Sequence, residues 1–105
     1  MVVKVIWSAF ALHQLKKIHN YYKIEAGEKI AQKLTKSIVE TTIQLASNPQ
    51  IGTIEHLLAH TKYEYRFVVM KNYKIIYRID NEFVSIISVF DTRQNPEKIR
   101  ELKDK

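Results

Sequence analysis

Apolar and polar residues alternate through residues 63–93, and this alternation predicts three short strands. The strands are rich in aromatic and β-branched residues and cover 63–70, 73–79 and 83–90. Polar segments that favour tight turns separate them: Lys71-Asn72 after the first strand and Asp80-Asn81-Glu82 after the second. The chain leaves the third strand through another turn-forming segment, 91–96. We therefore expect an antiparallel hairpin sheet against which the rest of the chain packs.

The first loop fixes which side chains share a face of this sheet. A two-residue loop pairs Met70 with Tyr73, and side chains alternate from there. The apolar face, which we expect to be covered by helices, carries Val68, Met70, Tyr73, Ile75, Tyr77, Ile79, Val84, Ile86 and Phe90. The opposite face, which we expect to be open, carries Tyr65, Phe67, Val69, Lys74, Ile76, Arg78, Phe83, Ser85 and Ile87, followed by Asp91 and Arg93. Arg66 falls on the apolar face, so either its stem packs there while its guanidinium reaches out, or the register shifts locally.

Helical periodicity replaces the alternation in the N-terminal half of the chain. A β-branched run at 2–7 predicts a strand, and Ser8 after it is a favourable helix N-cap. Apolar residues then recur at helical spacing over 9–24 and, after a break at 25–28, in a longer helix that ends near Asn48-Pro49. These residues are Ala11, Leu15, Ile18 and Tyr22, then Ile30, Leu34, Ile38 and Leu45. Two helices joined by so short a loop pack antiparallel.

The C-terminal segment predicts one more helix, over about 96–103. Asn95 offers an N-cap, Pro96 suits the first helical position, and Glu97 places an acid in the first turn. The whole order of elements predicts an α+β fold, with an N-terminal strand, an antiparallel helical hairpin on one face of a mainly antiparallel sheet, and a short C-terminal helix. At 105 residues, we expect one domain that spans 1–105.

Residues 50–62 show no clear periodicity and stay unassigned. His56 and His60 stand four residues apart, which is the spacing of helical metal ligands, but no Glu or Asp completes a set and a chance pair is the commoner case. The chain has no cysteine, no glycine-rich phosphate loop and no hydrolase or metalloprotease motif. We therefore expect no metal, no cofactor and no small-molecule substrate.

Composition narrows the class of partner. The net charge of +6 and the pI of about 9.6 favour a polyanionic partner, either nucleic acid or an acidic protein. Most lysines lie in the predicted helices, where they are equally consistent with a solvated surface. The arginines are more selective, because Arg66, Arg78 and Arg93 lie in or beside the sheet. No apolar run approaches the ~20 residues of a membrane span, so we expect a cytoplasmic protein without membrane contact.

Three segments, in this order and spacing, resemble toxins of the RelE/ParE superfamily from type II toxin–antitoxin modules. They are the N-terminal strand leading into WSAFALHQLKKI, the second helix closing at SNPQIG, and YRFVVMKNYKIIYRI followed by VFDTRQNP. The resemblance covers essentially the whole chain. It implies a small basic toxin that arrests growth when free and that is held inactive by a cognate antitoxin wrapping around it.

The same resemblance implies one of two activities. RelE-like members are ribosome-dependent nucleases that cut mRNA with basic side chains on the open sheet face and a tyrosine near the C-terminus, whereas ParE-like members share the fold and poison DNA gyrase. By position, Lys74 and Arg93 match two phosphate-binding arginines of the nucleases. Tyr65 and Phe67 stand where the nucleases hold lysines, and the catalytic tyrosine position falls near Ile99.

RNA cleavage through the 2′-hydroxyl requires particular chemical groups, which can be compared with these residues. It needs a proton acceptor, a proton donor and cations around the charged phosphorane. The candidate cations are Lys74, Arg78 and Arg93, with Arg66 as a further contact to nucleic acid or to the target. Tyr65 and Asp91 are the candidates for proton transfer, although Tyr65 is equally suited to stack on a base.

The lysines and the catalytic tyrosine of the nucleases have no counterpart here, which favours a gyrase poison slightly over a ribosome-dependent mRNA endoribonuclease. Because only the endoribonuclease is an enzyme in this comparison, it stays open whether the toxin is one. A third interpretation is an inactive relic kept for its contact with the antitoxin. The cations on the sheet could also be solvated, or could pair with an acidic antitoxin segment. The partners expected are thus an antitoxin and either DNA gyrase or ribosome-bound mRNA.

Overall fold

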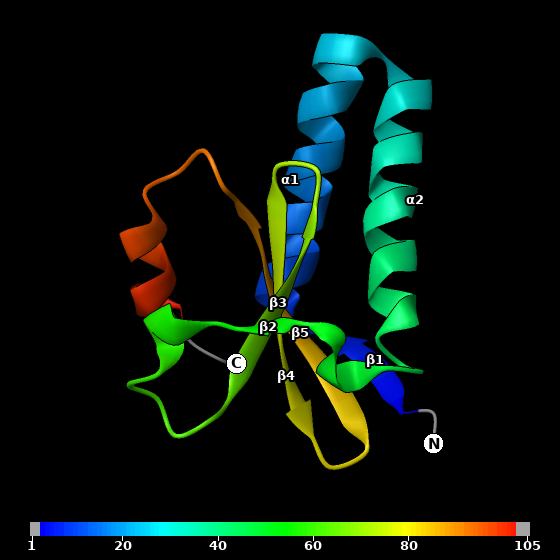
Figure 1. Ribbon diagram of the computed structural model, residues 1–105. Helices are drawn as coiled ribbons and strands as arrows, with labels where there is room; N and C mark the ends of the chain where they lie inside the picture. The colour runs from blue at the N-terminus through cyan, green and yellow to red at the C-terminus, as the bar shows by residue number, and fades with distance from the viewer. Residues whose placement is uncertain (1–2, 103–105) are drawn as a thin grey trace.

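The computed structural model describes residues 3–102, in which a pair of helices covers one face of a five-stranded sheet (Figure 1). The main elements are β1 (Lys4–Trp7), α1 (Ala9–Ala26), α2 (Glu28–Gln44), β3 (Tyr65–Met70), β4 (Tyr73–Asp80) and β5 (Phe83–Asp91). The strand order is β1-β5-β4-β3-β2, where β2 is the short strand Thr53–Ile54. β1 is parallel to β5, and all other pairs are antiparallel. The predicted α+β architecture is confirmed. The predicted ends of the first strand, at residue 2, and of the last helix, at residue 103, lie outside the described residues.

Local sequence signals explain where the two long helices begin and end. The Ser8 side chain accepts a hydrogen bond from the Ala11 backbone N–H at 3.0 Å, as expected of an N-cap. The predicted break is a single residue, Gly27, which ends α1 and precedes α2. Its φ of +98° lies in a region that residues with a Cβ rarely adopt, so glycine permits the sharp reversal between the helices.

The segment that the sequence left unassigned forms a connector of short elements. It contains η1 (Pro49–Ile51), β2 (Thr53–Ile54), which pairs with the edge of β3, and η2 (His56–Leu58). The predicted C-terminal helix is η3 (Pro96–Glu101), a 3-10 helix. Its start is as expected, since the Asn95 side chain accepts from the Glu97 N–H at 3.0 Å. No helix within residues 3–102 is long and apolar enough to cross a membrane.

The main core lies between the helical pair and the sheet, on the face that the alternation identified. Met70 pairs with Tyr73 across the two-residue loop, so the predicted register holds. Most of the sheet residues assigned to this face do pack against α1 and α2, among them Tyr73, Ile75, Tyr77, Val84 and Ile86, all nearly inaccessible to solvent. The helices contribute Ala11, Leu34, Ile38 and Leu45.

The assignment of Phe90 to this core is wrong, because β5 contains a β-bulge. Ile76 pairs with Ser88 while the next residue, Tyr77, pairs with Ile86, so Ile87 is an extra residue in β5. An extra residue inverts the alternation of side chains beyond it. Val89 therefore takes the place in the main core, and Phe90 points to the opposite face.

The prediction that the opposite face is open is also wrong over part of its area. A second core there packs η2 and η3 against the sheet: Leu58, Tyr65, Ile76, Ile87, Phe90 and Ile99. Figure 1 shows η3 and part of the connector on the side of the sheet away from the helical pair. Ile99, near the position of the tyrosine in the nucleases, is fully buried in this second core. The segments covering the face are the short, weakly periodic ones that sequence patterns identify poorly.

Candidate functional site

Lys74 lies on the predicted face of β4, but it is not a free cation. Its Nζ donates a hydrogen bond to Glu55 Oε2 at 2.7 Å and stands 4.0 Å from the centre of the Phe67 ring. Glu55 is only 4% exposed, and its other oxygen accepts from the Leu57 backbone N–H at 3.2 Å. The connector thus places a carboxylate on Lys74 where a nuclease would need the ammonium for a phosphate. Glu55 was not among the predicted site residues, although it is the one acidic residue among 50–62.

Arg78 and Tyr65 are likewise held by neighbouring side chains. The guanidinium of Arg78 lies 3.9 Å from the centre of the Tyr63 ring and donates to Asp80 at 3.2 Å. Tyr65 is 4% exposed and meets Tyr63 edge-to-face, with the ring centres 6.3 Å apart. A buried ring in a packed core is badly placed to stack on a base or to transfer a proton to a substrate.

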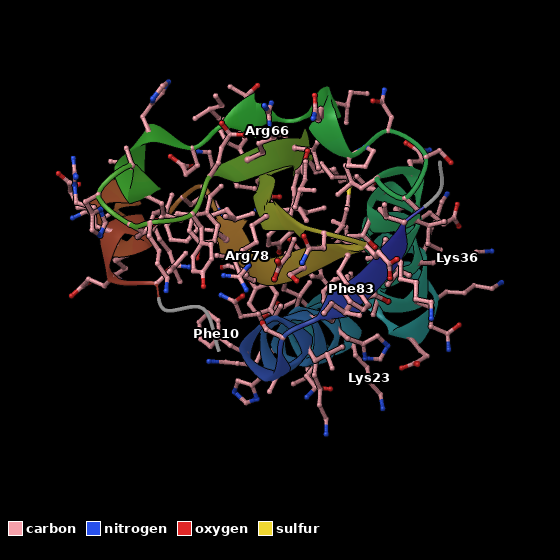
Figure 2. The ribbon with its side chains drawn as sticks, turned by 90° about the horizontal axis from the view of Figure 1, so that it is seen from below. Phe10, Lys23, Lys36, Arg66, Arg78 and Phe83 are labelled. Atoms are coloured by element: carbon pink, nitrogen blue, oxygen red, sulfur yellow. The ribbon has the colours of Figure 1, made fainter. Side chains whose placement is uncertain are left out.

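Arg66 anchors the connector instead of reaching toward a ligand. One terminal nitrogen donates to the carbonyls of Gly52 at 2.8 Å and Gln50 at 3.3 Å, and the other donates to Glu64 at 3.2 Å. The register is unshifted, so Arg66 stays on the apolar face as predicted. Its guanidinium does not reach out, however, because the side chain is only 19% exposed and its terminal nitrogens end on the connector and Glu64. Figure 2 shows Arg66 beside the connector and Arg78 nearer the centre of the sheet.

Asp91 and Arg93 form a bidentate ion pair, with Nε to Oδ1 at 3.0 Å and Nη2 to Oδ2 at 2.7 Å. The Arg93 backbone N–H also donates to Asp91, at 2.9 Å. Hydrogen bonds from Arg93 outweigh partial burial and lower the pKa of Asp91 to about 2. Such a carboxylate is a weak proton acceptor at neutral pH, which argues against Asp91 as a general base.

The expectation that Asp91 and Arg93 share a face with Lys74 is wrong. Asp91 pairs with Tyr73, the residue before Lys74, and neighbouring residues of a strand point to opposite faces. Asp91 and Arg93 instead line a hollow of about 600 Å³ against α1. The bulge in β5 causes the difference, because it reverses every side chain after Ile87. The predicted site is thus divided between the two sides of the sheet.

Burial also changes the acidity of the tyrosines on the helical side. The pKa of Tyr73 is raised far above its usual value of 10, first by burial and then by its neighbour Tyr22. Burial likewise raises the pKa of Tyr77, whose hydroxyl donates to the Pro49 carbonyl at 2.6 Å and accepts from the Gly52 N–H at 2.9 Å. Both phenols stay neutral at physiological pH and act as structural hydrogen-bonding groups.

The Asp91–Arg93 pair should make stability pH-dependent in a narrow acid range. The pKa of Asp91 is about 2 in the folded protein and near 3.8 when unfolded, so its contribution is complete above pH ~4 and is lost as the pH falls toward ~2. We expect Asp91→Asn to flatten the fall in unfolding free energy between pH 4 and 2, as measured by urea unfolding at each pH. Glu40→Gln, which removes an exposed acid of α2, is the control and should follow the wild type. Parallel curves for Asp91→Asn and the wild type would contradict this assignment.

Within residues 3–102, no group of three or more His, Cys, Asp or Glu side chains is arranged to hold a metal ion. The predicted residues Lys74, Asp91 and Arg93 belong to two separate ion pairs: Lys74 with Glu55 on one face of the sheet, and Asp91 with Arg93 beside α1.

Comparison with known proteins defines the class. The family model of the ParE toxin of the type II toxin–antitoxin system parDE matches residues 5–96. This chain therefore belongs to the ParE toxin family and is the toxin component of a type II toxin–antitoxin system. A solved chain of the chromosomal ParDE TA system from P. aeruginosa has the same fold, with a TM-score of 0.72 and 17% identity over 86% of this chain and 96% of that one. A search of curated proteins finds no match.

Proposed function

We propose that this toxin poisons DNA gyrase and that a cognate antitoxin keeps it inactive until the antitoxin is lost. Membership of the ParE toxin family supports the growth-inhibiting role. The choice of gyrase over mRNA rests on the residues that a nuclease would need, because in this structure they are paired or buried. Lys74 is neutralised by Glu55, and Tyr65 lies in a packed core.

The remaining proton-transfer candidate supports the same choice. Asp91 has a pKa of about 2 and lies on the other side of the sheet from Lys74, so the two cannot act on one phosphate as an acid–base and cation set. The position of the catalytic tyrosine in the nucleases falls near Ile99, which is a buried apolar residue. A poison that acts by binding needs a shaped and charged surface, and this chain retains one with a net charge of +6.

Induced expression without antitoxin tests the proposal directly. We expect growth arrest together with a DNA-damage response, and we expect the purified toxin to block gyrase supercoiling of a relaxed plasmid. The control is the same gene with a stop codon within α1. Primer extension on cellular mRNA should show no codon-phased cuts.

Three outcomes would count against the proposal. Codon-phased mRNA cuts that disappear in Lys74→Ala would establish the nuclease instead. Normal growth on expression of a stable, folded chain would indicate the inactive relic. Growth arrest with unaffected supercoiling and no DNA-damage response would exclude gyrase as the target.

A further inference from the structure

The hollow beside α1 carries a line of side chains that neither the family nor the nuclease comparison assigns. Its wall on α1 includes Phe10, Gln14, Lys17 and Tyr21, which recur every three or four residues and so lie on one face of the helix. Phe10 is 42% exposed and Tyr21 is 53% exposed, large fractions for aromatic rings. At 1.5 Å per residue, this line is about 16 Å long.

Cations lie along the same hollow. Lys17 comes from α1, and Arg93 comes from the segment after β5, opposite it. The one acid of the lining, Asp91, is already paired with Arg93. A second hollow of about 290 Å³ shares Phe10 and Gln14 and adds the cation Lys98 and the acid Glu101, so the groove continues toward η3. The groove therefore combines aromatic rings, amide side chains and positive charge.

We propose that this groove, defined by Phe10, Gln14, Lys17, Tyr21, Arg93 and Lys98, binds a single-stranded nucleic acid. Proteins that bind single strands combine a positively charged groove with aromatic rings on which successive bases stack. A length of about 16 Å corresponds to about five steps of a stacked strand at 3.4 Å each. Lys17 and Lys98 are the cations available to the phosphates, because Arg93 is already paired with Asp91. Gln94 lines the same groove, and its Oε1 accepts from Lys98 at 3.3 Å.

The edge of β5 argues against an extended peptide as the occupant. A peptide that adds to a sheet edge uses the free backbone groups of that edge. Here the Gln14 side chain accepts from the Val89 N–H at 2.8 Å, and the Ser8 hydroxyl donates to the Ile87 carbonyl at 3.3 Å. The side chains of Gln14 in α1 and of its N-cap Ser8 thus already occupy two of the backbone groups of β5 beyond the end of β1. The exposed rings and cations are what remain available to a ligand.

The ring of Tyr21 is held in place before any ligand arrives. It meets Tyr22 edge-to-face, with ring centres 5.1 Å apart and planes at 85°. A fixed ring loses little conformational entropy on stacking, which favours binding.

A lysine outside the groove is available as a control. Figure 2 places Phe10 at the start of α1 and Lys36 away from it on the other helix, so Lys36 supplies this lysine.

Fluorescence anisotropy with a labelled 12-nucleotide oligothymidylate, and with the matching oligouridylate, tests the inference on the full chain. Binding should weaken about tenfold in Tyr21→Ala and be retained in Tyr21→Phe, which keeps the aromatic face. Lys17→Ala should lower the slope of log affinity against log salt by about 0.7, whereas Lys36→Ala should change the slope far less. The three substituted positions are all exposed, and thermal unfolding checks that each of the four variants folds.

The inference does not rest on gyrase as the target, since the oligonucleotide assay contains none. Preference for the deoxy strand identifies DNA as the natural ligand, preference for the ribo strand identifies RNA, and equal binding indicates a groove that ignores the 2′-hydroxyl; each supports the inference. No binding by the folded wild type overturns it. Wild-type affinity in Tyr21→Ala, or an equal loss in Lys17→Ala and Lys36→Ala, also overturns it, because charge alone would then explain the binding. Displacement by polyglutamate as effectively as by unlabelled oligothymidylate would point to an acidic peptide instead.

Discussion

Gly52→Ala should lower the free energy of unfolding by about 2–4 kcal/mol, which is the cost of overpacking a rigid site together with the loss of a buried hydrogen bond. A Cβ at Gly52 would stand 2.5 Å from the Tyr77 hydroxyl and 2.8 Å from the Phe67 carbonyl. Neither neighbour can move cheaply, because Tyr77 is fully buried and the Phe67 carbonyl belongs to β3. The backbone of Gly52 is ordinary extended chain at φ −71°, so close approach, and not a special conformation, requires glycine here.

Thermal unfolding measured by circular dichroism checks this prediction. For a domain of this size, the expected loss corresponds to a fall in Tm of about 10 °C or more. Thr53→Ala, an exposed neighbour in β2, is the matched control and should change the unfolding free energy by less than about 0.5 kcal/mol. A Tm for Gly52→Ala equal to that of Thr53→Ala would mean that the connector is not clamped between Tyr77 and β3.

The long periodic elements were predictable, because each buries one continuous face. Helical spacing identified the buried positions Ala11, Leu34 and Ile38, and alternation across a two-residue loop identified Tyr73 and the rest of the helical face of the sheet. In both cases one period holds over many residues, so a few positions that depart from the pattern do not change the predicted element.

The bulge in β5 was not predictable, and it altered the site more than any other feature. Ile86, Ile87, Val89 and Phe90 are all apolar, and the one polar residue between them, Ser88, is itself fully buried, so polarity does not reveal which face each one takes. A one-residue insertion changes the face of everything after it. The bulge places Phe90 in the second core and Asp91 on the side of the sheet that faces α1, whereas the unbroken alternation predicted the opposite faces.

The partner of Lys74 was hidden for a different reason. Glu55 lies nineteen residues earlier in a connector without regular structure, and the ion pair forms only because β2 pairs with β3 and brings that connector over the sheet. Contacts of this kind depend on tertiary placement, which local patterns do not encode. The same holds for Ile99, which is buried because η3 packs against η2 and the sheet.

Glu55→Gln should lower the free energy of unfolding by about 2 kcal/mol. Removing one partner of a buried ion pair costs about 3–5 kcal/mol, and the cost is smaller here because Lys74 is 20% exposed and can reach water. Glutamine keeps an oxygen for the Leu57 N–H, so the change isolates the charge. Glu64→Gln, at a surface pair with Arg66, is the control and should cost less than about 1 kcal/mol.

A double-mutant cycle with Lys74→Met separates the ion pair from general effects of the substitutions. Because Lys74→Met removes the unpaired ammonium, the double variant should recover most of the stability lost in Glu55→Gln, with a coupling of about 1–3 kcal/mol. Glu55→Gln should also gain stability from added phosphate more than the wild type does, since Lys74 becomes available to an anion. Equal stability of Glu55→Gln and the double variant, or an equal response of Glu55→Gln and wild type to phosphate, would show that Glu55 does not neutralise Lys74. The main support for preferring gyrase over mRNA as the target would then be lost.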